Sequence, residues 1–237
     1  MRRRLIVALD GLPSLRDATD SADVDLAAAA TLAELAGVDA VRLGVGEDLK
    51  PVREEDLEET RRAVRCLELR MPPVPALVRV AMTIRPDRVL LSAEGRDGRS
   101  PSGPLDLRGR PQPVSAVVRT LGEAGIPVGA VLAPDLETVK HAHGAGVAAV
   151  ELHTGTIVDL PGPERMVALQ RLADAVRLAS KLRLAVGVGG GLGFRSVGEV
   201  LAASPPLESV AIGRAALARA MLVGIDRAVR DLRALVG

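Results

Sequence analysis

The chain has 237 residues, and its 31 Lys and Arg nearly cancel its 30 Asp and Glu, which leaves a formal charge of +1. A balance this even argues against a nucleic-acid-binding protein, which usually carries a basic stripe. With no Trp, no Tyr and one Phe, the chain also lacks the aromatic side chains on which flat rings or single-stranded nucleic acid would stack.

Short apolar runs alternate with segments of helical periodicity along the whole chain. In chain order we expect strand 5–9, helix 23–37, strand 40–45, helix 53–65, strand 66–71, helix 74–85, strand 88–93, helix 114–125, strand 127–133, helix 135–146, strand 148–153, helix 163–182, strand 183–188, helix 197–203, strand 209–212 and helix 215–236. Eight strand–helix units, in a length close to the roughly 250 residues of such a barrel, predict a single (β/α)8 (TIM) barrel over residues 1–237. The polar segment Glu94–Pro113 is long for a barrel loop, so we expect a lid or a flexible loop there.

Several features bear on where the protein works. The one cysteine, Cys66, excludes an internal disulfide and fits a reducing compartment, and we expect it in the core at the start of a strand. The basic start, MRRR, is followed by too short an apolar run before Asp10 to serve as a signal peptide. The chain contains no apolar run of about 18 residues that would span a membrane. We therefore expect a cytoplasmic protein with no membrane or nucleic-acid partner.

Glycines mark the ends of the last two expected strands. Gly190 and Gly191 follow the seventh strand, and Gly213 and Arg214 follow the eighth. In α/β barrels these two loops commonly hold a phosphate, because glycine lets backbone N–H groups approach an anion and the next helix N-terminus favours negative charge. We expect these four residues to bind a small phosphorylated ligand. The alternative is that the glycines only form tight turns.

Side chains alternate between the two faces of each strand. Since Val41 and Leu43 are apolar and should face the helices, Arg42 and Gly44 should face the inside of the barrel. The same parity points the following side chains inward: Asp10, Glu68, Arg70, Ser92, Glu94, Glu151 and His153. Buried charges persist only when they are paired and hydrogen-bonded. We therefore expect a compensated ion network in which arginines lie among carboxylates.

Most of the sequence resembles one known family. The segment VELHTG (150–155) is identical to a motif of the pyridoxine 5′-phosphate synthase family, and AIGRAALARAMLVGIDRAVRDL (211–232) is similar to its last strand exit and helix. The segments LRDA, LAELAGVDAV and PDRVLLSAE also match. The resemblance implies a (β/α)8 barrel, usually an octamer, that condenses 3-amino-2-oxopropyl phosphate with 1-deoxy-xylulose 5-phosphate. We expect a homo-oligomer without cofactor or metal.

The residues that the family uses for catalysis are missing. Its catalytic His, catalytic Glu and proton-donor His fall on Gly44, Arg70 and Gly190, whereas Asp10 and Arg16 match the family and are expected to bind ligand. Glycine has no group to transfer a proton, and arginine stays charged at any working pH. Each lost acid or base is worth about 10²–10⁴-fold in rate, although such effects are not strictly additive. The resemblance therefore favours a non-catalytic or regulatory paralogue.

Other interpretations stay open at individual positions. Glu151 and His153 are candidates for a catalytic base and the group that orients it, or they belong only to the ion network. Asp10 binds a ligand hydroxyl or pairs with an inward arginine. Arg42 and Arg70, with Glu68, either plug the emptied site or form a second anion site. The alternatives to a non-catalytic paralogue are altered chemistry that uses Glu151, His153 and Asp10, or slow native synthesis.

Overall fold

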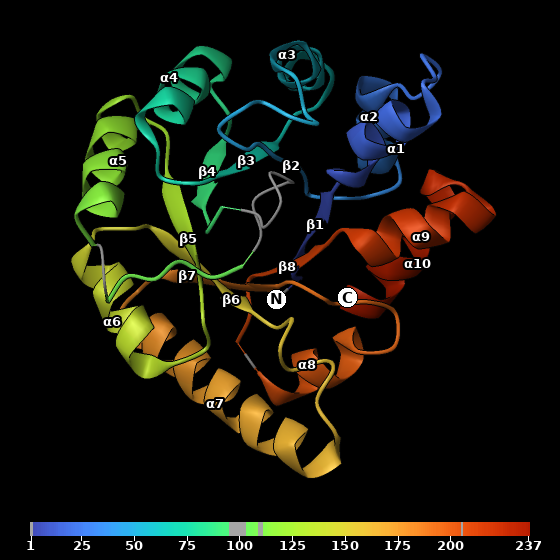
Figure 1. Ribbon diagram of the computed structural model, residues 1–237. Coiled ribbons are helices and arrows are strands. Elements are labelled where there is room, and N and C mark those ends of the chain that lie inside the picture. Colours follow the sequence, from blue (N-terminus) through green and yellow to red (C-terminus); the bar gives the residue numbers. More distant parts are fainter. Residues whose placement is uncertain (1, 95–102, 109–110, 205) are drawn as a thin grey trace.

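The computed structural model describes residues 2–94, 103–108, 111–204 and 206–237. Eight parallel strands pair in sequence order and close into a barrel, β1 pairing with both β2 and β8. Helices surround the barrel on the outside (Figure 1). The fold expected from the sequence, a (β/α)8 barrel, is confirmed. Much of the segment Glu94–Pro113 lies outside the described residues.

The strand boundaries agree with the expected ones to within about two residues. The strands are β1 (Arg4–Ala8), β2 (Ala40–Gly44), β3 (Leu67–Met71), β4 (Arg88–Leu91), β5 (Val128–Leu132), β6 (Ala149–His153), β7 (Ala185–Gly189) and β8 (Ser209–Ile212). The helices are α1 (Gly11–Thr19), α2 (Leu26–Leu35), α3 (Glu54–Ala63), α4 (Pro75–Ile84), α5 (Pro111–Glu123), α6 (Leu136–Gly144), α7 (Gly162–Lys181), α8 (Val197–Ala203), α9 (Arg214–Val223) and α10 (Ile225–Val236).

The short helix α1 was not expected from the sequence. Gly11 and Pro13 suggest a turn, yet proline is tolerated in the first turn of a helix, where its missing N–H would have no partner in any case. Pro13 is buried in the structure, and α1 contacts α9. A helix this short is marginal by itself and depends on tertiary contacts of this kind.

The expected C-terminal helix is divided into two. Gly224 lies between α9 and α10 with φ of 80°, a left-handed conformation that glycine adopts without strain. Helix α10 then packs against α2 and α8, and it buries Ala228, Val229, Leu232 and Val236. The break lets the chain turn back onto the barrel instead of continuing past it.

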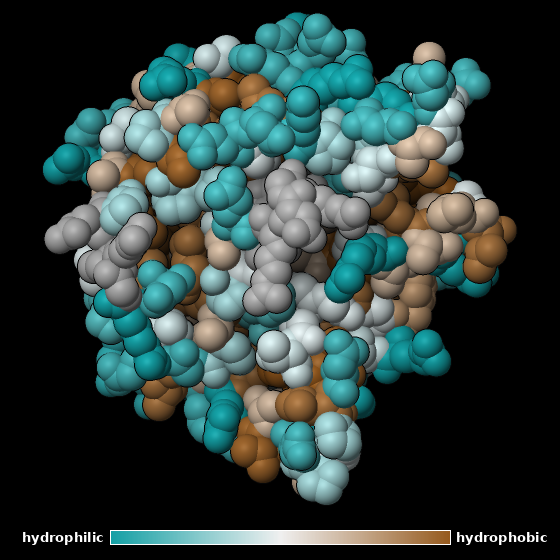
Figure 2. All heavy atoms as spheres, viewed as in Figure 1, coloured by the Kyte–Doolittle hydropathy of each residue, from teal (hydrophilic) through white to brown (hydrophobic). Residues whose placement is uncertain are grey.

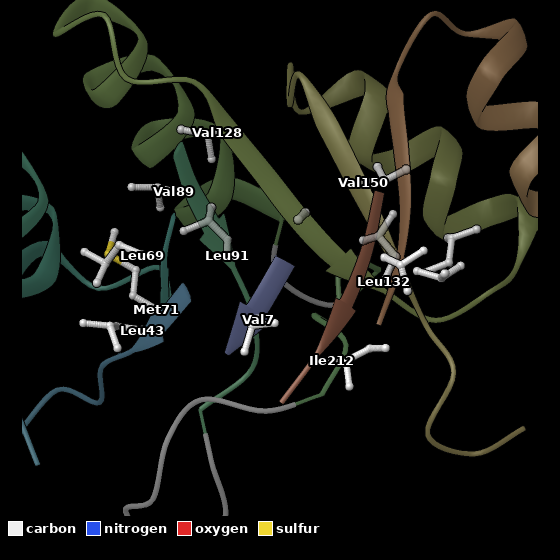
Figure 3. Packing of buried hydrophobic residues seen from close by; sticks show 14 of the residues in the cluster. Val7, Leu43, Leu69, Met71, Val89, Leu91, Val128, Leu132, Val150 and Ile212 are labelled. Carbon is white, nitrogen blue, oxygen red and sulfur yellow. The ribbon is translucent and has the colours of Figure 1, made fainter. Parts of the chain in front are cut away.

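The main core lies between the barrel and its helices, as the strand alternation predicted. Val7, Leu43, Leu69 and Leu91 point from successive strands into this layer, and each is fully buried (Figure 3). Fully burying such a side chain is worth roughly 1.5–3 kcal/mol relative to leaving it exposed. This layer fixes the strand register, and with it the set of residues that face inward.

The face of the molecule that Figure 2 shows is mostly polar. In Figure 2 hydrophilic residues cover much of the visible face, and apolar residues gather on the side of α9 and α10. Met221 and Leu222 at the end of α9 are 77% and 79% exposed. Within the described residues, no helix is both long enough and apolar enough to cross a membrane.

Candidate functional site

The C-terminal ends of all eight strands open at one rim of the barrel, where barrel enzymes place their chemistry. Gly44 and Arg70 are register partners at the ends of β2 and β3, and His153 ends β6 opposite Gly189 of β7. Asp10 follows β1. The strand order therefore brings the sequence-predicted candidates from four separate parts of the chain to the same rim.

Asp10 and Arg70 form an ion pair at this rim. Arg70 Nη2 donates to Asp10 Oδ2 at 2.5 Å, and the backbone N–H of Gly44 donates to Asp10 Oδ1 at 2.6 Å. A Cβ added at Gly44 would lie 3.3 Å from the Asp10 carboxylate. Of the two alternatives for Asp10, the structure shows the pairing with an inward arginine, beside a glycine that leaves it room.

Arg42 holds a second ion cluster one layer deeper in the barrel. Its Nη2 lies 2.9 Å from Glu68 Oε2 and 2.7 Å from Glu151 Oε2, and its side chain is only 2% exposed. Burial by itself would lower the Arg42 pKa, but the Coulombic attraction of Glu151 and then Glu68 outweighs it and raises the pKa. The compensated ion network expected from the strand parity is therefore present, and it occupies one oxygen of Glu151.

The N-terminal end of the barrel holds a small cavity of about 30 Å³, which is room for water. Its lining is Arg4, Ile6, Arg42, Glu68, Arg88, Leu90, Ala149, Val150, Glu151, Ala185, Glu208 and Ser209. Several of these begin their strands, so the cavity lies at the opposite end from the rim. In barrels of this kind the N-terminal end contributes to stability, whereas the C-terminal rim holds the active site.

Cys66 also lies at this N-terminal end. It is half-buried and not fully in the core as expected, and it packs beside the inner cluster of Ile6, Ala40 and Ala211. Arg4 Nη2 donates to its Sγ at 3.4 Å. Burial raises the pKa of the Cys66 thiol, which keeps it protonated and unreactive at neutral pH.

His153 occupies a slot between two glycines. A Cβ added at Gly155 or at Gly190 would lie 2.5 Å from an atom of the imidazole, and Gly190 has φ of 87°. The ring therefore fills the space that a side chain at position 190 would need. Burial lowers the pKa of His153. The positive charges of Arg70 and Arg214 lower this pKa further, whereas the negative charge of Glu151 raises it. A neutral imidazole at neutral pH is able to accept a proton.

The loops after β7 and β8 carry the expected phosphate-binding residues. Gly190 and Gly191 both have positive φ, at 87° and 72°. Gly213 precedes α9, no side chain of the described residues caps that helix, and Arg214 in its first turn is exposed. Uncapped N–H groups at a helix N-terminus next to an exposed guanidinium are able to hold a phosphate. The ligand itself stays a prediction.

Thr154 is a residue of the rim that sequence reasoning did not single out. It is fully buried, and its Oγ1 donates to the carbonyl oxygens of Gly189 at 3.0 Å and Gly190 at 2.5 Å. Its backbone N–H also donates to the Gly189 oxygen at 2.8 Å. Thr154 thus fixes the turn after β7. The feature of the sequence that could have indicated Thr154 is its position directly after His153, where β6 ends.

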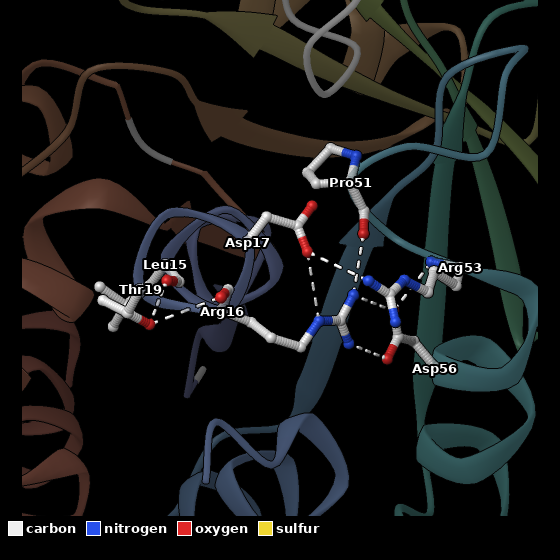
Figure 4. Close-up of polar contacts among 7 residues, drawn as sticks. All are labelled: Leu15, Arg16, Asp17, Thr19, Pro51, Arg53 and Asp56. Carbon is white, nitrogen blue, oxygen red and sulfur yellow. Dashed lines mark hydrogen bonds and ion pairs between the residues drawn. The ribbon is translucent and has the colours of Figure 1, made fainter. Parts of the chain in front are cut away.

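Arg16 is engaged within the protein. Its Nη1 and Nη2 contact the two oxygens of Asp56 at 2.6 and 3.1 Å, Nη2 also donates to the Pro51 carbonyl at 3.1 Å, and Nε lies 3.5 Å from Asp17 (Figure 4). The hydrogen bond to Asp56 raises the Arg16 pKa. This guanidinium ties α1 to α3, so a ligand role at Arg16 would require these contacts to break.

No three His, Cys, Asp or Glu side chains of the described ranges come together in a way that would hold a metal ion. His141 and His143 are both exposed on α6. The groups that the structure does bring together at the rim are guanidinium, carboxylate, imidazole and backbone N–H. Such a set is suited to binding anions and moving protons.

Comparison with known proteins finds relatives over almost the whole chain. The family described as pyridoxal phosphate biosynthesis protein PdxJ matches residues 5–237. Pyridoxine 5′-phosphate synthase of Thermosynechococcus vestitus is 37% identical over 235 residues, which cover 97% of each chain. The synthase of Synechococcus sp. (strain CC9605) is 35% identical over 231 residues, covering 97% of this chain and 92% of that protein.

Solved structures share the fold at low identity. The 3-hexulose-6-phosphate synthase from Salmonella typhimurium superposes with a TM-score of 0.61 at 16% identity, covering 100% of this chain and 98% of that one. Thiamine phosphate pyrophosphorylase from Pyrococcus furiosus gives 0.61 at 16% identity, with 98% and 95% covered. At this identity the likeness concerns the barrel alone.

Proposed function

This chain belongs to the family of pyridoxal phosphate biosynthesis protein PdxJ, and we propose that it binds a small phosphorylated ligand at the barrel rim without condensing two substrates into pyridoxine 5′-phosphate. The observation that carries this proposal is the pairing of Arg70 with Asp10 beside Gly44. At the positions that resemblance assigns to proton transfer, the rim holds a committed ion pair and two glycines.

Ring formation from two keto-phosphates requires several proton transfers, each by a group within hydrogen-bond reach of its proton. Gly44 and Gly190 have no such group, and position 70 has an arginine, whose guanidinium is a donor with no acceptor lone pair for a proton. At about 10²–10⁴-fold for each acid or base, these losses account for most of an enzyme's rate enhancement. The rim of this chain therefore favours binding over condensation.

The phosphate end of the rim supports a phosphorylated ligand. The uncapped N-terminus of α9, the positive-φ turn at Gly190 and Gly191, and the exposed Arg214 remain in place. These groups supply backbone N–H donors and a positive charge, which is what a phosphate dianion needs. The role that fits binding without turnover is that of a regulatory or non-catalytic paralogue.

Two further expectations belong to this proposal. Family likeness supports a cytoplasmic homo-oligomer, an octamer in the usual case, and Met221 and Leu222 provide exposed apolar surface for contacts between copies. Light scattering on the purified chain measures the assembly. A monomer at micromolar concentration would contradict this part of the proposal.

The test incubates the purified chain with 3-amino-2-oxopropyl phosphate and 1-deoxy-xylulose 5-phosphate and follows pyridoxine 5′-phosphate by mass spectrometry. The synthase of Thermosynechococcus vestitus, assayed in parallel, is the positive control. We expect product from the control and none above background from this chain. Product at rates typical of enzymes would refute the loss of condensation activity.

A second test addresses binding. Glycerol 3-phosphate, titrated by isothermal calorimetry, should bind the unmodified chain, and Arg214→Gln should weaken it. The matched control is Arg62→Gln, which removes an arginine that is paired with Glu58 on the surface of α3. Equal affinity in the Arg214 and Arg62 variants would exclude the α9 end as the phosphate site.

His153 favours a second candidate function, an enzyme that moves a proton on a phosphorylated substrate. Its imidazole lies over Gly190 at the rim, and burial lowers its pKa so that the neutral form is available as a base. Dihydroxyacetone phosphate in D₂O is a direct probe, because a base at the rim would exchange its carbon-bound hydrogens. Exchange that His153→Gln abolishes supports this function, and no exchange above the protein-free rate excludes it for this substrate.

A further inference from the structure

We propose that the ligand of this rim carries a carboxylate as well as a phosphate, and that Arg70 is the residue that binds the carboxylate. The chemical class is therefore a short phosphorylated carboxylic acid. This inference rests on the proposed function, since it places a second anchoring point beside the phosphate end formed by Gly191, Gly213 and Arg214.

Arg70 has hydrogen-bonding capacity that the described part of the chain does not use. A guanidinium carries five N–H donors. The bond from Nη2 to Asp10 is the contact that the structure gives for this side chain, and Nε is buried without an acceptor among the described residues. The Arg70 side chain is 17% exposed, so bulk water satisfies it only in part. A buried N–H donor without an acceptor is costly, and the partly exposed part of the guanidinium offers further N–H donors to the two oxygens of a planar carboxylate.

The carboxylates near Arg70 are each paired already. Asp10 accepts from both Arg70 and the Gly44 N–H, and Glu151 pairs with Arg42. Deeper in the barrel, Glu68 pairs with the same Arg42 as Glu151 does. Side-chain nitrogens of Arg4 and Arg88 also lie within 4 Å of Glu68. Arg214 has no ion pair within the described residues, and its charge acts on His153 together with that of Arg70. Asp10 thus matches the charge of Arg70, whereas the described residues give the positive charge of Arg214 no carboxylate partner.

The second group is a carboxylate and not a second phosphate because of the charge that it must match. The single positive charge of Arg70 is already matched by Asp10, so each negative charge that a ligand adds at the remaining N–H edge is in excess. A phosphate dianion would add two uncompensated negative charges in a largely buried setting, where such charge is strongly disfavoured, whereas a carboxylate adds one. A planar, singly charged carboxylate fits this edge, and the dianion belongs at α9, where N–H groups and Arg214 add to each other.

The experiment compares phosphorylated acids with a phosphorylated alcohol. Calorimetric affinities are measured for 2-phosphoglycolate, 3-phosphoglycerate and 4-phosphoerythronate against glycerol 3-phosphate, which has a hydroxymethyl group where 3-phosphoglycerate has its carboxylate. We expect at least one acid to bind about ten-fold or more tightly than glycerol 3-phosphate, which corresponds to about 1.4 kcal/mol. Propane-1,3-diol bisphosphate is included as a second dianion.

The Arg70→Met variant should lose this advantage, so that the acids and glycerol 3-phosphate bind alike, while the affinity for glycerol 3-phosphate changes by less than about two-fold. Arg70→Lys keeps a charge but not the planar fork, and it should lose most of the advantage while folding normally, which covers the case in which the methionine variant fails to fold. The matched control is Arg88→Gln, which removes an arginine from the opposite end of the barrel and should retain the advantage.

The outcomes separate the two levels of the proposal. If glycerol 3-phosphate binds and no acid binds more tightly, the carboxylate site is refuted and the phosphate site stands. If the bisphosphate binds as tightly as the best acid, Arg70 recognises negative charge and not a carboxylate, and the assignment is wrong. If none of these probes binds, the proposed function itself fails, and this inference fails with it.

Discussion

The Arg70 guanidinium and the Asp10 carboxylate meet at 2.5 Å across the rim, although the residues belong to β3 and to the turn after β1. The contact does two things. It neutralises a carboxylate that also accepts from the Gly44 N–H, and it lies at the position onto which the sequence resemblance places the catalytic Glu of the synthase family. The pair is only partly shielded from water, since the two side chains are 17% and 16% exposed.

Asp10→Asn should destabilise the protein by about 1–3 kcal/mol, because Arg70 then loses a charged partner and Gly44 a strong acceptor. Urea unfolding measures the change. A double-mutant cycle with Arg70→Met should show coupling of about 0.5–3 kcal/mol. As the control, Glu58→Gln removes an exposed partner of Arg62 and should cost no more than about 0.5 kcal/mol. Equal effects at the two sites would show that the rim pair contributes no more than a surface pair.

Arg42→Met should cost about 3–5 kcal/mol, because it leaves Glu68 and Glu151 buried without their shared partner. The measurement is again the free energy of unfolding. Replacing Arg62 by Met on exposed α3 gives the baseline for losing an arginine. A change at Arg42 below about 1 kcal/mol would mean that water enters the barrel and solvates both carboxylates.

Gly190→Ala should destabilise by more than about 1 kcal/mol, since the new Cβ needs both a positive φ and the space of the His153 ring. The ring would have to leave its slot, so its NMR signals should shift as well. Gly198→Ala in α8 is the control: it has open space around it and should be neutral or stabilising by about 0.5–1 kcal/mol. Unchanged His153 signals in the Gly190 variant would contradict the slot.

His153 should make stability depend on pH. Burial and the two arginines lower its pKa in the folded state below the ordinary value near 6.5, so the unfolded state binds more protons at moderately acidic pH. The contribution of His153 to the free energy of unfolding is therefore complete above about pH 7. It is lost progressively as pH falls from the pKa of the unfolded state to the lower pKa of the folded state. Urea midpoints between pH 8 and pH 5 should fall less steeply in His153→Gln. Identical slopes in the two proteins would show that His153 does not titrate differently on unfolding.

Ligand binding should raise the pKa of His153, whereas burial lowers it. A bound anion beside His153 favours the imidazolium, so the affinity for phosphorylated acids should rise as pH falls towards the folded pKa of His153. Calorimetry in buffers with different ionisation enthalpies reports the proton uptake directly. In His153→Gln the uptake should disappear. Uptake that persists in this variant would assign it to another group.

The sequence by itself determined the barrel, its strand order and the residues that face inward. These features depend on local periodicity: a buried strand is a short apolar run, and alternation assigns Leu43 to the helix side and Arg42 to the lumen. It also determined the family, because matching segments occur in the same order along the chain. It did not indicate α1 or the break at Gly224, where tertiary contacts and a single φ angle outweigh the helix pattern.

Only the tertiary structure decided which charges meet. The sequence did not indicate which carboxylate pairs with Arg70. In the barrel its partner is Asp10, because β1 and β3 lie on either side of β2, the strand that ends at Gly44. The slot of His153 and the tie from Arg16 to Asp56 are likewise contacts between segments far apart in the chain. Periodicity fixes the direction in which a side chain points, but its partner depends on which strands become neighbours and on how far each side chain reaches.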